Sequence, residues 1–203
     1  MKKIYNVILS LLGILLILIS IGAFFNVFYL SSAYDSYGIF WVCFSAVPIV
    51  GIGVLLKKTS ILKSQLYILA IPDLIWTVDF ISYIASGKSL FGIVDYFFIE
   101  SLIIPRLVTL HHLIIVPVIY YATLVLDHKK ENSWKISIVQ LTLIFFLTRI
   151  FTSSEVNINC VYDFCGRFSL NMPSIYPILW FSGAFLMIYI TRKIFIMIYR
   201  KFS

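Results

Sequence analysis

The stretch I-Y-N-V-I-L-S-L-L-G-I-L-L-I-L-I-S-I-G-A-F-F-N-V-F-Y-L, residues 4–30, contains no charged side chain. A helix needs about 20 mostly apolar residues to cross the hydrocarbon core of a bilayer, so this stretch predicts a transmembrane helix. Lys2 and Lys3 precede it, as basic residues precede a secretory signal. The apolar run is much longer than the roughly 7–15 residues of a signal h-region, and we therefore expect the helix to be retained.

The composition of the whole chain points the same way. Of the 203 residues, 61% are hydrophobic and only 12% are charged, whereas about a quarter of a soluble domain is charged. A soluble domain of this size cannot bury so much apolar surface. These proportions exclude a soluble fold, a disordered chain and a nucleic-acid partner, so the net charge of +7 reflects membrane topology.

We predict an all-α integral membrane protein, in which a bundle of six transmembrane helices forms a single domain; seven helices are the alternative. The predicted segments are residues 4–30, 38–56, 65–85, 105–126, 134–151 and 174–191, and the last could continue to residue 199. Glycines and charged residues interrupt the aromatic stretch 86–104, so we expect this stretch to be interfacial or re-entrant.

The distribution of basic residues predicts the orientation. Twelve of the 16 Lys and Arg residues fall at alternate ends of the six segments, and such ends face the cytoplasm. The loops at the opposite ends are mainly acidic and contain Asp35, Asp95, Glu100, Glu155 and Asp163, with Lys88 and Arg167. We therefore expect both termini to be cytoplasmic.

Several ionisable residues lie inside or close to the apolar segments, where insertion costs about 2.5–3.5 kcal/mol each and calls for a reason. From a rise of about 1.5 Å per residue, Asp79 and the two adjacent histidines lie about 9–10 Å below the outer surface. Polar residues of the outer loop follow just above them. The predicted ligand-binding residues of this outward-facing pocket are Asp79, His112, Asp73, His111, Arg106, Arg149, Glu155, Asn157 and Asn159.

The spacing of these residues limits the chemistry. Adjacent residues on a helix are about 100° apart, so at most one of His111 and His112 is expected to face the pocket. Asp73 and Asp79 are about 120° apart, which argues against a carboxylate pair sharing one proton. Structural roles are the alternative: an ion pair between Asp79 and an arginine, a neutral histidine bonded between helices, or an arginine that reaches the headgroups.

The three cysteines divide between a span and the outer loop. Cys43 is expected to be a small residue of the hydrophobic core. Cys160 and Cys165, in C-V-Y-D-F-C, could form a disulfide on the extracytoplasmic side or remain free thiols. A metal site in this loop is disfavoured because the loop contains no histidine. We expect no metal site elsewhere either, because two adjacent histidines should diverge.

Three functions remain open for the pocket. The leading hypothesis is binding or translocation of a small polar solute, ion or lipid headgroup, with Asp79 and His112 as the groups that change charge. The second is an intramembrane enzyme acting on a lipid or lipid-linked substrate, although no H-E-x-x-H or G-x-S-x-G motif is present. The third is a structural or assembly factor. Haem is disfavoured because His128 lies at the cytoplasmic end, and the cofactor and the oligomeric state stay open.

Three motifs resemble those of an uncharacterised family of prokaryotic polytopic membrane proteins. They are I-P-D-L-I-W-T-V-D-F (71–80), L-H-H-L-I-I-V-P (110–117) and E-V-N-I-N-C-V-Y (155–162), with His112 as the matching histidine. Cys160 stands where that family has tryptophan, and Asp163 where it has glycine. The resemblance implies a prokaryotic plasma membrane and no particular activity. The positions that it emphasises are Asp73, Asp79, His112, Asn157 and Asn159.

Overall fold

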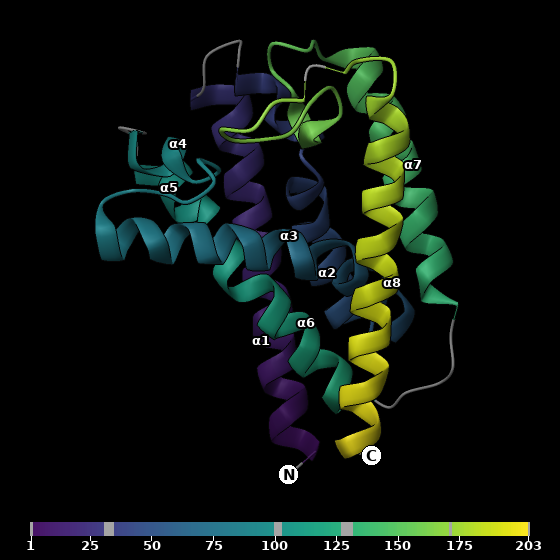
Figure 1. Ribbon diagram of the computed structural model, residues 1–203. Coiled ribbons are helices and arrows are strands. Elements are labelled where there is room, and N and C mark those ends of the chain that lie inside the picture. Colours follow the sequence, from purple (N-terminus) through teal and green to yellow (C-terminus); the bar gives the residue numbers. More distant parts are fainter. Residues whose placement is uncertain (1, 31–34, 100–102, 127–131, 171, 203) are drawn as a thin grey trace.

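The protein is helical throughout the part that the structure describes. The computed structural model covers residues 2–30, 35–99, 103–126, 132–170 and 172–202, and every regular element in these ranges is a helix. The first residues of α1 (Lys2–Phe25) and the last residues of α8 (Tyr176–Phe202) lie at the same end of the molecule (Figure 1). The all-helical prediction is therefore confirmed.

Five helices in the described ranges are long and apolar enough to cross a membrane. They are Ile4–Phe28, Thr59–Ser86, Arg106–Val125, Ser133–Phe151 and Tyr176–Tyr199. The second predicted segment is different, because α2 (Val42–Leu55) has 14 residues and follows a separate 3₁₀ helix, η2 (Asp35–Phe40). At about 1.5 Å per residue, α2 is roughly 21 Å long, shorter than a hydrocarbon core of about 30 Å.

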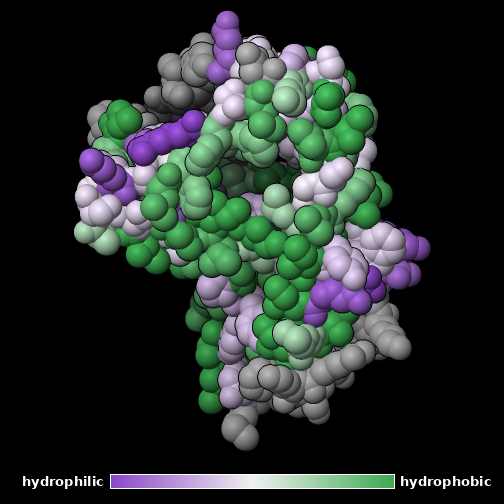
Figure 2. Space-filling model, in the orientation of Figure 1, coloured by the Kyte–Doolittle hydropathy of each residue, from purple (hydrophilic) through white to green (hydrophobic). Residues whose placement is uncertain are grey.

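The molecular surface is rich in apolar side chains. Large hydrophobic residues such as Leu11, Ile150 and Ile178 are more than 60% exposed. Figure 2 shows hydrophobic residues over most of one face, while hydrophilic residues gather in separate patches at its margins. An apolar surface this large is unfavourable in water and is typical of proteins that contact lipid.

Glycine brings α1 and α2 into close contact. A Cβ atom on Gly13 would lie 2.9 Å from Cγ of Leu55, and one on Gly51 would lie 3.1 Å from the carbonyl oxygen of Gly13. Small residues that face each other let two helix backbones approach, which supplies van der Waals contact where a lipid environment offers no hydrophobic drive. This contact fixes α2 against the longest uncharged segment of the chain.

Several helices extend beyond their predicted ends. α3 (Thr59–Ser86) begins six residues before the predicted start at residue 65, and α8 continues past residue 199. The polar residues at the start of α3 are part of the helix, because they form hydrogen bonds with α7 (Ser133–Phe151). The side-chain amides of Gln65 and Gln140 bond to each other in both directions, at 2.7 and 3.2 Å, and such pairs join helices within apolar surroundings.

The predicted fourth segment is divided in two. It consists of α5 (Ile103–Thr109) and α6 (His111–Val125), which meet at Leu110. Before it, residues 87–94 form a loop and α4 (Asp95–Ile99) is a helix of five residues, too short to cross a membrane. Figure 1 shows α3 running across the lengthwise α7 and α8, with its later half projecting beside α4 and α5. Distance along α3 therefore does not measure depth, which removes the basis for placing the polar residues at one level.

Candidate functional site

The nine residues predicted for the pocket lie in separate places. Asp79 bonds to the loop that follows α3. Asn157 and Asn159 lie in the loop between α7 and α8, where Glu155 is exposed. Arg149 places its guanidinium over the rings of Tyr162 and Phe145, at 4.8 and 5.5 Å. Asp73, His111 and His112 form part of a different cluster, which also contains Cys43; Asp73 and His111 are buried in it, and His112 and Cys43 are half-buried.

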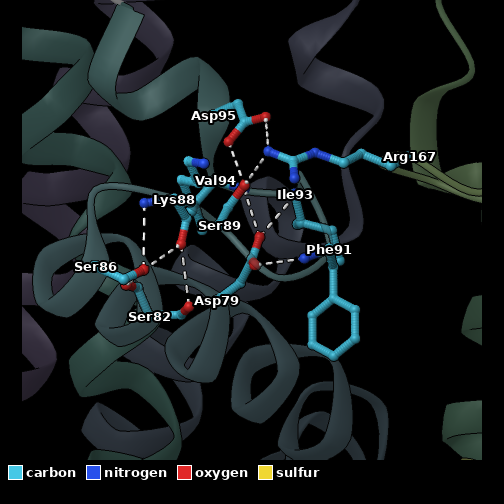
Figure 3. A network of polar contacts seen from close by, with 10 residues as sticks. All are labelled: Asp79, Ser82, Ser86, Lys88, Ser89, Phe91, Ile93, Val94, Asp95 and Arg167. Carbon is cyan, nitrogen blue, oxygen red and sulfur yellow. Dashed lines mark hydrogen bonds and ion pairs between the residues drawn. The ribbon is translucent and has the colours of Figure 1, made fainter.

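Asp79 is fully buried and bonds to the backbone. Its carboxylate accepts hydrogen bonds from the N–H groups of Phe91 at 2.7 Å, Ile93 at 2.8 Å and Val94 at 3.1 Å. In Figure 3 the carboxylate points into the loop, whose backbone wraps around it. Asp79 was considered as the partner of an arginine, but its carboxylate bonds to backbone N–H groups instead. These hydrogen bonds hold the loop in its conformation.

A second set of contacts holds this loop to the outer loop. Arg167 donates to Ser89 Oγ at 3.0 Å and forms an ion pair with Asp95 at 3.3 Å, while its backbone N–H donates to the Phe91 carbonyl at 2.9 Å (Figure 3). Ser89 Oγ also donates to Asp95. The Ser89 hydrogen bond, followed by the Arg167 contact, lowers the pKa of Asp95 below its usual value. These contacts are structural, because they join the loop after α3 to the loop between α7 and α8.

The loop between α7 and α8 is itself tightly folded. Cys160 and Cys165 form a disulfide with Cα atoms 5.2 Å apart, so one of the two alternatives left open for them is realised. Asn157 Oδ1 accepts from the Tyr162 N–H at 3.0 Å. Asn159 Oδ1 accepts from the Val42 N–H at 2.8 Å, and its Nδ2 donates to the Phe40 carbonyl at 2.7 Å. Both asparagines are therefore occupied in holding the loop and the start of α2.

The buried cluster brings together the starts of two helices and the middle of a third. Cys43 lies in the first turn of α2, the two histidines open α6, and Asp73 follows Pro72 inside α3. The ligand atoms of Cys43, His111 and His112 all lie within 4.8 Å of one another. Asp73 is 4% exposed and lies on α3, which packs against both α2 and α6. The cluster therefore combines one thiol, two imidazoles and one carboxylate.

The two histidines converge, contrary to the expectation that they diverge. Their ring centroids are 4.1 Å apart. Each ring turns back to the carbonyl three residues earlier: His111 Nδ1 lies 2.7 Å from the Val108 oxygen, and His112 Nδ1 lies 2.8 Å from the Thr109 oxygen. Both side chains lean back over the preceding turn, as helical side chains do.

These contacts fix the proton positions on the histidines. A carbonyl oxygen only accepts hydrogen bonds, so Nδ1 carries the hydrogen in both rings, and Nε2 of a neutral ring keeps a lone pair. Trp76 stacks on the His112 ring with centroids 4.8 Å apart, and its Nε1 donates to the Tyr96 hydroxyl at 3.2 Å. The orientation of His112 is thus held from two sides.

Two acceptors in the cluster have no hydrogen-bond partner. They are Asp73 Oδ2 and His111 Nε2, on side chains that are 4% and 5% exposed. An unpartnered buried polar group costs about 1–3 kcal/mol, which a bound ligand would recover. Arg106 Nε is also buried without a partner, but its guanidinium is directed to the Phe98 carbonyl at 3.5 Å.

No protein-family model, no curated protein and no solved structure matches this chain. Its function therefore has to follow from the chemistry of the buried cluster. Cys43 and Trp76 are the members that the sequence did not identify as site residues. Cys43 lies near the predicted outer end of its segment, as the two histidines do, and this shared position was the available signal.

Proposed function

We propose that this chain is a six-span membrane protein that binds a small cation or a protonated solute in the cluster of Cys43, Asp73, His111 and His112, as the first step of its translocation. The observation that carries the proposal is the pair of unpartnered, almost fully buried acceptors, Asp73 Oδ2 and His111 Nε2. Buried acceptors without partners inside apolar segments are rare and mark ion or solute sites.

The atoms of the cluster indicate the charge of the ligand. A carboxylate oxygen, two imidazole nitrogens with lone pairs and a sulfur all attract positive charge or hydrogen-bond donors. An anion or a phosphate headgroup would need the arginines, but Arg149 lies over aromatic rings and Arg106 is directed to a backbone carbonyl. The site proposed here therefore contains fewer residues than the pocket predicted from the sequence, and it excludes Asp79.

We also propose that the chain crosses the membrane an even number of times, with six crossings if the crosswise α3 and the η2–α2 pair each count as one, and that both termini lie in the cytoplasm of a prokaryotic cell. Support comes from the common end of α1 and α8 (Figure 1), which an even number of crossings requires. The basic residues at alternate ends of the segments support the same orientation.

The test is ligand-dependent stabilisation of the full chain in detergent. Thermal unfolding is measured with Na⁺, K⁺, Ca²⁺, Zn²⁺ and a series of protonated amines. A ligand at 100 times its Kd should stabilise the wild type by about 2.7 kcal/mol, and Asp73→Asn should remove most of this increment. Asp95→Asn is the matched control and should retain it, because Asp95 lies on the loop network away from the cluster. If no compound stabilises the wild type, or if Asp73→Asn retains the full increment, the proposal is wrong.

A further inference from the structure

The cluster contains a set of atoms that suits a transition metal in particular. Cys43 Sγ and the free Nε2 atoms of His111 and His112 come from the first turns of two helices that pack together. Cys43 is the only free thiol of the chain, because the other two cysteines form the disulfide. One sulfur and two imidazoles favour zinc or a similar metal over Mg²⁺ or Ca²⁺, which take oxygen ligands.

The distances permit a tetrahedral site. Zn–N bonds of about 2.0–2.1 Å and a Zn–S bond of about 2.3 Å place the ligand atoms roughly 3.3–3.6 Å apart. Cys43 Sγ and one ring nitrogen of each histidine already lie within 4.8 Å of one another. Side-chain rotation that draws them together by roughly 1–1.5 Å would complete the arrangement.

The groups behind the histidines are those that a metal site uses. Histidine ligands usually donate the second ring N–H to a carbonyl or carboxylate, which fixes the ring and raises its basicity. His111 and His112 have such carbonyl partners at 2.7 and 2.8 Å. The stacked Trp76 ring further restricts His112. These contacts engage Nδ1 of each ring and leave Nε2 as the nitrogen available for coordination.

Charge balance favours a divalent ion. Binding replaces the S–H bond of Cys43 with an S–metal bond, and the proton leaves, so no electron is transferred. The thiolate neutralises one positive charge and an ionised Asp73 neutralises the other, outside the coordination shell. A neutral complex avoids the cost of an unbalanced charge in an apolar interior.

We propose that Cys43 Sγ and the Nε2 atoms of His111 and His112 bind Zn²⁺ or a chemically similar divalent transition-metal ion, with Asp73 as the balancing charge. This inference rests on the proposed function, since it names the cation that the cluster takes. Three protein ligands leave one tetrahedral position for water or an exchanging ligand, as in exchangeable rather than purely structural zinc sites.

Cobalt titration of the full chain in detergent tests the site directly. After chelator treatment under anaerobic conditions, we expect one equivalent of Co²⁺ to produce the visible bands of tetrahedral cobalt and a thiolate-to-cobalt charge-transfer band. One equivalent of Zn²⁺ should abolish both. Cys43→Ser should remove the charge-transfer band and weaken binding by more than about 100-fold. Cys160→Ser/Cys165→Ser is the matched control, which removes two cysteines and should keep the band.

Two further variants keep the test decisive. His111→Gln and His112→Gln should each weaken cobalt binding while preserving the charge-transfer band at saturation. Absence of cobalt bands in folded wild type overturns the metal site, and so does a charge-transfer band that persists in Cys43→Ser. If another cation still gives Asp73-dependent stabilisation, the proposed function survives alone. If cobalt binds equally well to Asp73→Asn, the metal site stands and the role given to Asp73 fails.

Discussion

Asp73 and Asp79 lie six residues apart on the same helix and are buried to almost the same extent, yet their surroundings differ. Asp79 accepts three backbone N–H groups from the loop that follows the helix, whereas Asp73 leaves one carboxylate oxygen without a partner. Burial of a charge therefore does not by itself indicate function. A carboxylate whose acceptor sites are filled supports the fold, and one with a free buried oxygen can bind a ligand.

We expect the largest change in the free energy of unfolding when Asp79 is replaced, and a much smaller change when Asp73 is replaced. Asp79→Ala leaves three buried N–H groups without an acceptor and should lower the free energy of unfolding by more than about 3 kcal/mol. Asp73→Ala, the same change on the same helix, should lower it by less than about 1 kcal/mol. Thermal unfolding in detergent without added ligand measures both. Equal losses would remove the distinction.

A second comparison extends this rule to the outer loop. Asn159→Ala breaks bonds to the Val42 N–H, the Phe40 carbonyl and the Thr148 hydroxyl, and should cost about 2 kcal/mol. Asn157→Ala is the matched control, since Asn157 also has a positive φ but bonds within its own loop. It should cost less in the same unfolding assay, and an equal cost would mean that the link to α2 contributes nothing.

A substitution at Asp73 that removes only the charge should increase the stability of the ligand-free protein slightly. Asp73→Asn removes a buried charge without a partner and should raise ligand-free stability by up to about 1 kcal/mol. The measurement is the thermal midpoint of ligand-free protein. A fall of more than about 1 kcal/mol would show that the Asp73 carboxylate already supports the fold, as the Asp79 carboxylate does.

We expect the smallest change in stability at Asp95, because this residue is partly exposed. Its folded-state pKa is lowered by Ser89 and Arg167, so its contribution to stability is present above the unfolded pKa of about 3.9 and is lost as the pH falls through the lower folded-state value. The stability difference between wild type and Asp95→Asn should therefore shrink as the pH is lowered from about 6 to about 3. A difference independent of pH would show that Asp95 contributes nothing through its charge.

Much of the fold could be predicted because it depends on local apolar runs. The uncharged residues 4–30 form α1 and η1 (Asn26–Leu30), and the runs before residues 86, 126 and 151 end α3, α6 and α7 within one residue of the predicted positions. The start of α3 could not be predicted so well, because its polar residues become compatible with a helix only through their partners on α7.

The site was predicted only in part. Asp73, His111 and His112 were identified because ionisable residues in apolar segments are costly wherever the helices pack. The spacing also predicted that Asp73 and Asp79 do not form a carboxylate pair sharing one proton, although both were assigned to one pocket. Asp79 was assigned to the pocket because no sequence pattern shows that the N–H groups of residues 91, 93 and 94 fold back onto its carboxylate.

The sequence by itself determined an all-helical chain with apolar segments, because hydrophobicity and helix formation act over one turn to a few turns of chain. Only the tertiary structure decided which polar groups have partners. Cys43, Asp73 and the two histidines come from three helices. Backbone carbonyls hold both histidine rings, and Trp76 also holds the His112 ring. Partner atoms distant in sequence decide whether a buried polar residue holds the fold or remains available to a ligand.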